Sequence, residues 1–189
     1  MVMSMLSENV PSQMQEVLSV LLECKLERIV RYSWCTTEEA IREYNLAEED
    51  VFSLTSGPVL MYFDSGLVVG AASDPEKNSV VLWIEKNEKG EVIDEPLEDD
   101  EELFPIDAKN QPGMWANLNG KNIASFKVIY RKPVSAKMEQ LPNEVGLAIV
   151  LNTGEQFILS HGLHDNSDDF SIITKDQINK SLTPDLVGI

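Results

Sequence analysis

The chain is poor in basic residues. Its 189 residues include 15 Lys and Arg against 32 Asp and Glu, which gives a formal net charge of -17 at pH 7. Proteins bind nucleic acid largely through Lys and Arg that displace counterions from the phosphates, so this balance argues against nucleic acid as a direct ligand. The same repulsion disfavours binding to anionic membrane surfaces.

Cysteines and long apolar runs are also scarce. Cys24 and Cys35 are the only cysteines, and they fit free thiols in a reducing compartment better than a disulfide framework, with a single bridge between them left open. No apolar run approaches the roughly 20 residues that span a bilayer. The segment Met1 to Val10 lacks the basic end and apolar block of a secretory signal. We therefore expect a cytoplasmic protein that does not bind membranes.

Motifs typical of catalysis are missing too. There is no G-x-S-x-G elbow, no G-x-x-x-x-G-K-[ST] phosphate loop and no G-x-G-x-x-G fingerprint. Metal-competent side chains gather only at His161, His164 and Asp165, where imidazole and carboxylate groups could bind zinc. Because His-x-x-His in a loop enforces no geometry and no further Cys or His completes the set, we predict a solvated turn and no cofactor. A metal-dependent enzyme using this loop is the alternative.

The first quarter of the chain shows helical spacing. Ser12 can cap a helix whose apolar residues recur every three or four positions through Leu22. Residues 25–34 are typical of a strand. Thr36 and Glu39 have the spacing of a capping box, which predicts a second short helix.

From residue 58 onward the pattern changes to short strands separated by turn residues. Residues 58–63, 67–72 and 79–85 predict an antiparallel meander, and residues 123–131 alternate as a strand does. Asn152 to Glu155 is the strongest hairpin signal, between strands at 147–151 and 156–160. A strand at 170–174 and a weak helix from Asp176 complete the prediction, with a short helical turn at 114–118. The pattern predicts one α+β domain over residues 1–189, with an antiparallel β-sheet in two meander or hairpin halves, an N-terminal helix and short additional helices.

What the sequence has in excess is negative charge in one stretch between predicted strands. Residues 91–102 contain no Lys or Arg and eight acids, which are Glu91, Asp94, Glu95, Glu98, Asp99, Asp100, Glu101 and Glu102. Like charges at this density stay hydrated unless a cationic partner covers them. Two interpretations remain open: a solvated loop, and a surface that steers and binds a basic protein such as a nuclease-like toxin.

Tryptophans next to predicted loops are candidate apolar anchors for such a partner. Trp115 follows the loop residues Gln111, Pro112 and Gly113, and Trp34 precedes another loop. Exposed Trp is common among the residues that dominate binding energy at interfaces. Packing in the core is the alternative for both side chains.

Several segments of residues 57–169 resemble small bacterial proteins of the toxin-immunity kind. The resembling segments are Phe63-Asp64-Ser65-Gly66 between two strands, Ser73-Asp74 before Ser79 to Trp83, Leu118 to Ile123 before a strand, and Gly146 to Glu155 followed by Leu159 to Leu163. The resemblance implies an acidic, noncatalytic α+β domain that blocks a cognate toxin by binding it. It assigns no binding residues and leaves out residues 1–56.

We therefore expect a nonenzymatic acidic binding protein, in the form of an immunity protein that neutralises a basic toxin by occluding it. The sequence leaves the oligomeric state open. The residues expected to contact the partner are Asp94, Glu95, Glu98, Asp99, Asp100, Glu101, Glu102 and Trp115.

Overall fold

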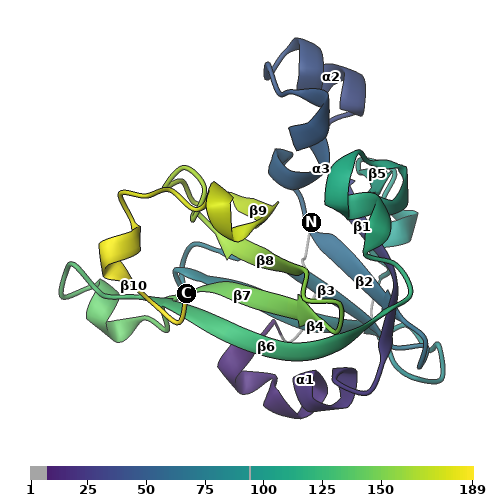
Figure 1. Cartoon of the computed structure of the whole chain (residues 1–189), viewed down its shortest axis with the longest axis horizontal. Helices are drawn as coiled ribbons and strands as arrows, with labels where there is room; N and C mark the ends of the chain where they lie inside the picture. The colour runs from purple at the N-terminus through teal and green to yellow at the C-terminus, as the bar shows by residue number, and fades with distance from the viewer. Residues whose placement is uncertain (1–7, 94) are drawn as a thin grey trace.

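Antiparallel strands dominate the computed structural model, which describes residues 8–93 and 95–189. Within these residues the strand order is β4-β3-β2-β1-β6-β7-β8-β9, and β5 and β10 pair with β1 and β6 (Figure 1). The strands are β1 (Lys25–Ser33), β2 (Val59–Phe63), β3 (Val68–Asp74), β4 (Ser79–Lys86), β5 (Phe104–Asp107), β6 (Lys121–Arg131), β7 (Glu144–Leu151), β8 (Gln156–His161), β9 (Phe170–Ile173) and β10 (Leu186–Val187). The helices are short: α1 (Gln15–Leu21), α2 (Thr37–Arg42) and α3 (Val51–Leu54).

Single turns of 3-10 helix occupy many of the connections. They are η1 (Pro11–Gln13), η2 (Glu48–Asp50), η3 (Leu97–Asp99), η4 (Ala108–Asn110), η5 (Gly113–Asn117), η6 (Met138–Gln140), η7 (Lys175–Gln177) and η8 (Thr183–Asp185). No helix in the described part of the chain is both long and apolar enough to cross a membrane.

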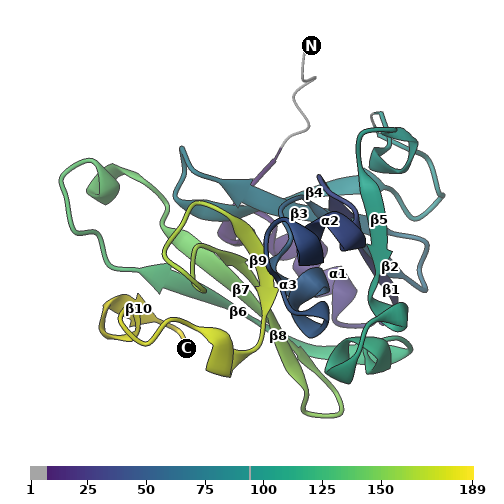
Figure 2. The ribbon, with the colours of Figure 1, turned by 90° about the horizontal axis from the view of Figure 1, so that it is seen from above.

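Strand β1 joins the two halves of the sheet. One edge of β1 pairs with β2. On the other edge, its first residues pair with β6 and its last four, Val30 to Ser33, pair with β5. The sheet folds over, so that β3 and β4 lie against β8 and β7 (Figure 2). Apolar side chains from both halves, including Leu82 and Phe157, fill the space between them, and α1 adds Leu18 and Leu21 to the same core.

The alternation of side chains along each strand also builds two smaller apolar clusters on the outer faces. Beneath the C-terminal segment, Ile129 and Ile158 pack with Ile178, Leu182 and Leu186. On the face formed by β1 to β4, a second cluster contains Val30, Tyr32, Leu60, Val68, Trp83 and Leu103. Leu97 and Leu103, in the segment between β4 and β5, are therefore packed onto the sheet.

The predicted strands and hairpin are confirmed, whereas the helices are shorter than predicted. The expectation of an N-terminal helix is wrong: α1 is short, spans Gln15–Leu21 after the 3-10 turn η1, and has no side-chain cap. Ser12 does not cap it, because Ser12 lies within η1 and the cap position of α1 is Met14; the Ser12 backbone N–H and hydroxyl donate instead to the carboxylate of Glu144 in β7. The helix expected from Asp176 consists of two separate 3-10 turns followed by β10, and the turn at 114–118 is also 3-10 helix.

Arg31 holds the segment between β1 and β2 in place. Its side chain is fully buried, and its guanidinium donates to the backbone carbonyl oxygens of Phe52, Ser53, Thr55, Gly57 and Phe170. Burial lowers the pKa of Arg31 to about 9, so the group remains charged at neutral pH. These contacts fix α3 and the following loop against β9, and α2 projects from that base (Figure 1).

Candidate functional site

The part of the acidic stretch that follows Asp94 lies across the outer face of the β1–β4 half. We call residues 95–103 the acidic strap. Leu103 is 6% exposed and Leu97 packs against the same apolar cluster, so both anchor the strap on the sheet. Between these two leucines the chain turns through η3. Burial of the two leucine side chains offsets the cost of holding so many like charges in one conformation.

A buried carboxylate fixes the start of the strap. Glu85 in β4 is 3% exposed, and its two oxygens accept hydrogen bonds from Trp83 Nε1 and from the backbone N–H of Leu97, each at 2.7 Å. The Trp83 indole lies directly against Gly70 in β3, where a Cβ atom would come within 2.1 Å of the ring. Glycine at position 70 therefore lets the indole lie flat on the sheet and aim its N–H at Glu85.

Glu98 is a second anchor, although part of its side chain is exposed to solvent. Its carboxylate accepts a hydrogen bond from the Tyr62 hydroxyl and lies 3.0 Å from Lys86 Nζ. The Tyr62 hydrogen bond, together with Lys86, lowers the pKa of Glu98. Burial and the hydrogen bond to Glu98 raise the pKa of Tyr62, whose ring also contacts the Arg28 guanidinium. Glu98 thus contributes to holding the strap in place.

The remaining acids of the strap face solvent. Glu95, Asp99, Asp100, Glu101 and Glu102 are exposed. The Asp100 side chain accepts a hydrogen bond from the backbone N–H of Glu102 at 2.9 Å, which fixes the local turn. The strap therefore presents carboxylates from a defined backbone. Asp94, which was also expected to contact a partner, lies outside the described residues.

Trp115 belongs to the core and not to the surface. It is 5% exposed, and its ring centroid lies 5.2 Å from that of Phe52 at an interplanar angle of 51°. Stacking on an aromatic neighbour stabilises such a side chain beyond the burial of its area. The expectation of an accessible anchor at Trp115 is not met in this structure, and the core-packing alternative describes this residue.

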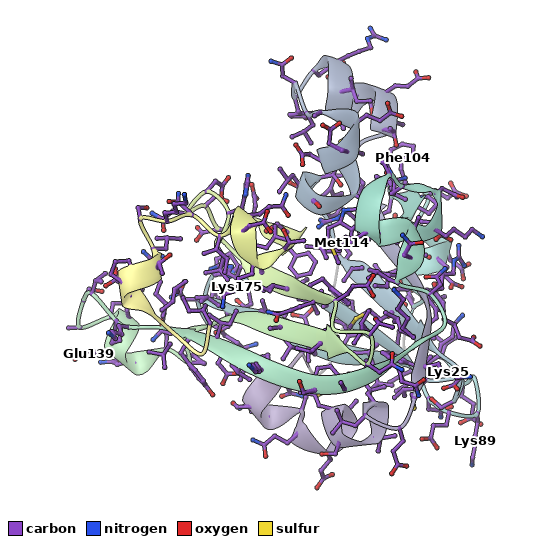
Figure 3. The ribbon with its side chains drawn as sticks, viewed as in Figure 1. Lys25, Lys89, Phe104, Met114, Glu139 and Lys175 are labelled. Carbon is purple, nitrogen blue, oxygen red and sulfur yellow. The ribbon has the colours of Figure 1, made fainter. Side chains whose placement is uncertain are left out.

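Exposed aromatic side chains occur instead around α2. Trp34, Tyr44 and Phe104 are 59%, 66% and 40% exposed. Trp34 follows the last residue of β1, whose Cα partner in β5 is Phe104, and Tyr44 follows α2. Phe104 lies beside the base of the projection formed by α2 and α3 (Figure 3), and α2 itself extends further from the sheet than β5 does (Figure 1). We call residues 34–50 together with Phe104 the α2 head.

The α2 head carries a second group of acids. Its exposed or half-buried carboxylates, with Arg42 as the basic residue among them, are Glu38, Glu39, Glu43, Glu48, Glu49 and Asp50. The helix that supports them begins at the predicted capping box: the Thr36 side chain accepts from the Glu39 N–H, and the Glu39 carboxylate accepts from the Thr36 N–H at 2.8 Å. Sequence analysis did not single these acids out, because at helical spacing they look like an ordinary solvent-facing side.

The histidine loop does not assemble as a metal site. His161 is 4% exposed and its Nε2 lies 3.2 Å from Asn78 Oδ1, whereas His164 Nδ1 lies 3.2 Å from the carbonyl oxygen of Gln177. The Asp165 carboxylate accepts from the Ser167 N–H. Across residues 8–93 and 95–189, no three His, Cys, Asp or Glu side chains come together in an arrangement that could hold a metal ion. Cys24 and Cys35 both carry free thiols.

Comparisons of the chain with protein-family models, with curated proteins and with solved structures find no match.

Proposed function

We propose that this chain is a nonenzymatic, cytoplasmic binding protein that uses the α2 head and the acidic strap to engage a basic protein. The observation that carries the proposal is the position of Trp34, Tyr44 and Phe104 beside two acidic segments. Protein interfaces commonly combine a few large aromatic side chains with a polar rim. Here the rim is acidic, which favours a partner whose contact surface is rich in Lys and Arg.

The order of the strap supports a role in recognition. A flexible acidic loop would lose conformational entropy on binding. The strap avoids much of this cost, because Leu97, Leu103 and Glu98 already hold its backbone on the sheet. Its exposed carboxylates can therefore attract a basic partner over the distance set by salt screening, about 8 Å at physiological ionic strength.

An immunity protein that occludes a basic toxin is the specific form of this proposal. It is supported by the resemblance of segments within residues 57–169 to toxin-immunity proteins and by the net charge of -17. Nucleases and other nucleic-acid-binding toxins carry basic surfaces. An acidic protein placed on such a surface would compete with the nucleic acid for it.

The test is the association rate with a basic protein encoded beside this chain, measured by stopped-flow across a salt series. A strap variant replaces four exposed acids with serine: Asp99, Asp100, Glu101 and Glu102. A control variant makes the same change in net charge elsewhere, at the exposed acids Glu16, Glu23, Glu139 and Asp169. Electrostatic steering is worth roughly 10- to 1000-fold in rate, so the strap variant should lose at least tenfold at low salt and the control much less.

A further variant separates the aromatic contribution from the charge. Trp34→Ala should raise the dissociation rate while leaving the salt dependence of association unchanged, because apolar anchors act after encounter. Equal association rates for the strap and control variants would refute the role of the strap. An unchanged dissociation rate in Trp34→Ala would show that the α2 head is not part of the interface.

A further inference from the structure

A cavity of about 510 Å³ lies between the turn that links β3 to β4 and the connection from β6 to β7. Its volume is within the range of small-molecule sites. Asn78 and Arg131 come from the two sides, and Lys137, Met138 and Leu141 come from the β6–β7 connection. With Pro75 and Glu76 from the β3–β4 turn, the cavity therefore combines two cationic side chains, one carboxylate, an amide and three apolar side chains.

A chain of amide hydrogen bonds builds the wall of this cavity. Asn78 Nδ2 donates to Asn143 Oδ1 at 2.8 Å, and Asn143 Nδ2 donates to the carbonyl oxygens of Met138 and Leu141 at 2.7 and 2.9 Å. Asn78 and Asn143 both have left-handed backbone conformations, with φ of 48° and 55°. Such conformations are held only where the surroundings compensate for them. The β6–β7 connection is thereby fixed against the β3–β4 turn.

The His161 side chain contacts the side-chain amide of Asn78. Its Nε2 lies 3.2 Å from Asn78 Oδ1. Because Asn78 Nδ2 is committed to Asn143, the Oδ1 atom must accept, so the proton of a neutral imidazole is on Nε2. Burial lowers the pKa of His161, which favours this neutral form. His161 therefore fixes the orientation of the Asn78 amide at the cavity.

Arg131 is the unexplained group at this site. Its Nη1 donates to Asn166 Oδ1 at 2.8 Å, which is a neutral acceptor, and its Nε is buried with no hydrogen-bond partner. No ion pair joins Arg131 to a carboxylate in the described part of the chain, although acids outnumber basic residues by 32 to 15. Because the surface of Nε is closed to solvent, a ligand in the cavity would have to accept from the terminal nitrogens of the guanidinium. Among the described residues these nitrogens donate a hydrogen bond only to the neutral Asn166, so the positive charge of Arg131 has no anionic partner there.

We propose that this cavity binds a small aliphatic carboxylate, independently of the interface proposed above. The carboxylate would accept from the Arg131 guanidinium, an arrangement that arginine favours, while Lys137 adds a second positive charge. Met138 and Leu141 would contact the aliphatic part. The exposed Glu76 also lines the cavity, and its charge favours a monoanion over a phosphate with two negative charges.

The test is a titration of the ¹⁵N-labelled full chain with pentanoate, followed by NMR. We expect saturable shifts of the Arg131 Nε–H resonance and of the backbone amides of residues 138–141. Arg131→Gln should weaken binding roughly 10- to 100-fold, the equivalent of a hydrogen bond to a charged group. Lys137→Gln, at an exposed position, should weaken it less. Lys132→Gln removes the same charge from an exposed neighbour that does not line the cavity, and it should bind pentanoate as the wild type does.

Two further ligands test the chemistry. 1-Pentanol has the same chain without the charge, and inorganic phosphate has the charge without the chain. If 1-pentanol binds as tightly as pentanoate, the site does not require a negative charge. If phosphate binds more tightly than pentanoate, the site does not require an aliphatic chain. Absence of a saturable shift, or an unchanged affinity in both Arg131→Gln and Lys137→Gln, would overturn the site itself. None of these results bears on the association rates that test the protein interface.

Discussion

The substitution Arg31→Met tests how the α2 head is held on the sheet. Five backbone carbonyl oxygens accept from this fully buried guanidinium. Each buried acceptor left without a donor costs about 1–3 kcal/mol, although local relaxation prevents these costs from adding. We expect a loss of about 3–5 kcal/mol in the free energy of unfolding, as found when one side of a buried charged contact is removed. Since domains are stable by only about 5–15 kcal/mol, the variant should be marginal.

Urea unfolding followed by circular dichroism measures this loss. Arg42→Met is the matched control, because Arg42 is exposed on α2 and should change stability by no more than about 0.5 kcal/mol. The loss of stability in Arg31→Lys should lie between those of the two Met variants, because an ammonium group has three N–H donors for the five carbonyl acceptors. A loss below about 1 kcal/mol in Arg31→Met, the net worth of one ordinary hydrogen bond, would refute the view that this side chain satisfies the carbonyls.

Local patterns were enough to predict most of the strands, because turn residues separate them. Asn152 to Glu155 does connect β7 to β8, and the alternating segment at 123–131 lies within β6. The sequence did not predict β5, because this strand has only four residues, contains Pro105 and follows a run of acids. The helix start at Ser12 failed for a different reason. Ser12 lies inside the 3-10 turn η1, two residues before the Met14 cap position of α1, and it donates to Glu144, 132 residues away.

For the candidate site, the sequence predicted an acidic surface, but it did not predict which residues form that surface. The density of negative charge was enough to predict that the acidic stretch is exposed. The anchoring of Glu98 could not be predicted, because Tyr62 and Lys86 come close to it only in the folded sheet. Trp34 and Trp115 gave the same signal, a tryptophan next to a loop. The two side chains differ in burial because Phe52 packs against the Trp115 ring, whereas Trp34 is 59% exposed.

Three smaller perturbations test the local geometry around the α2 head and the strap. Thr36→Ala should cost about 1 kcal/mol by removing the cap of α2, and Thr37→Ala, one residue further on, should cost less in the same urea titration. In Trp34→Phe, quenching of tryptophan fluorescence by acrylamide should fall sharply, because the other two tryptophans are 4% and 5% exposed; undiminished quenching would contradict their burial. Glu98→Gln tests the anchor of the strap through pH. The folded-state pKa of Glu98 is lowered from its usual value of 4.5, so its contribution to stability is complete above that value and is lost as pH falls through the lower, folded-state pKa. The wild type should therefore exceed the variant at pH 7 by less than about 1 kcal/mol, because Glu98 is partly exposed to solvent, and the difference should shrink on acidification. A difference that stays constant down to pH 2 would show that the loss comes from packing and not from the charge of Glu98.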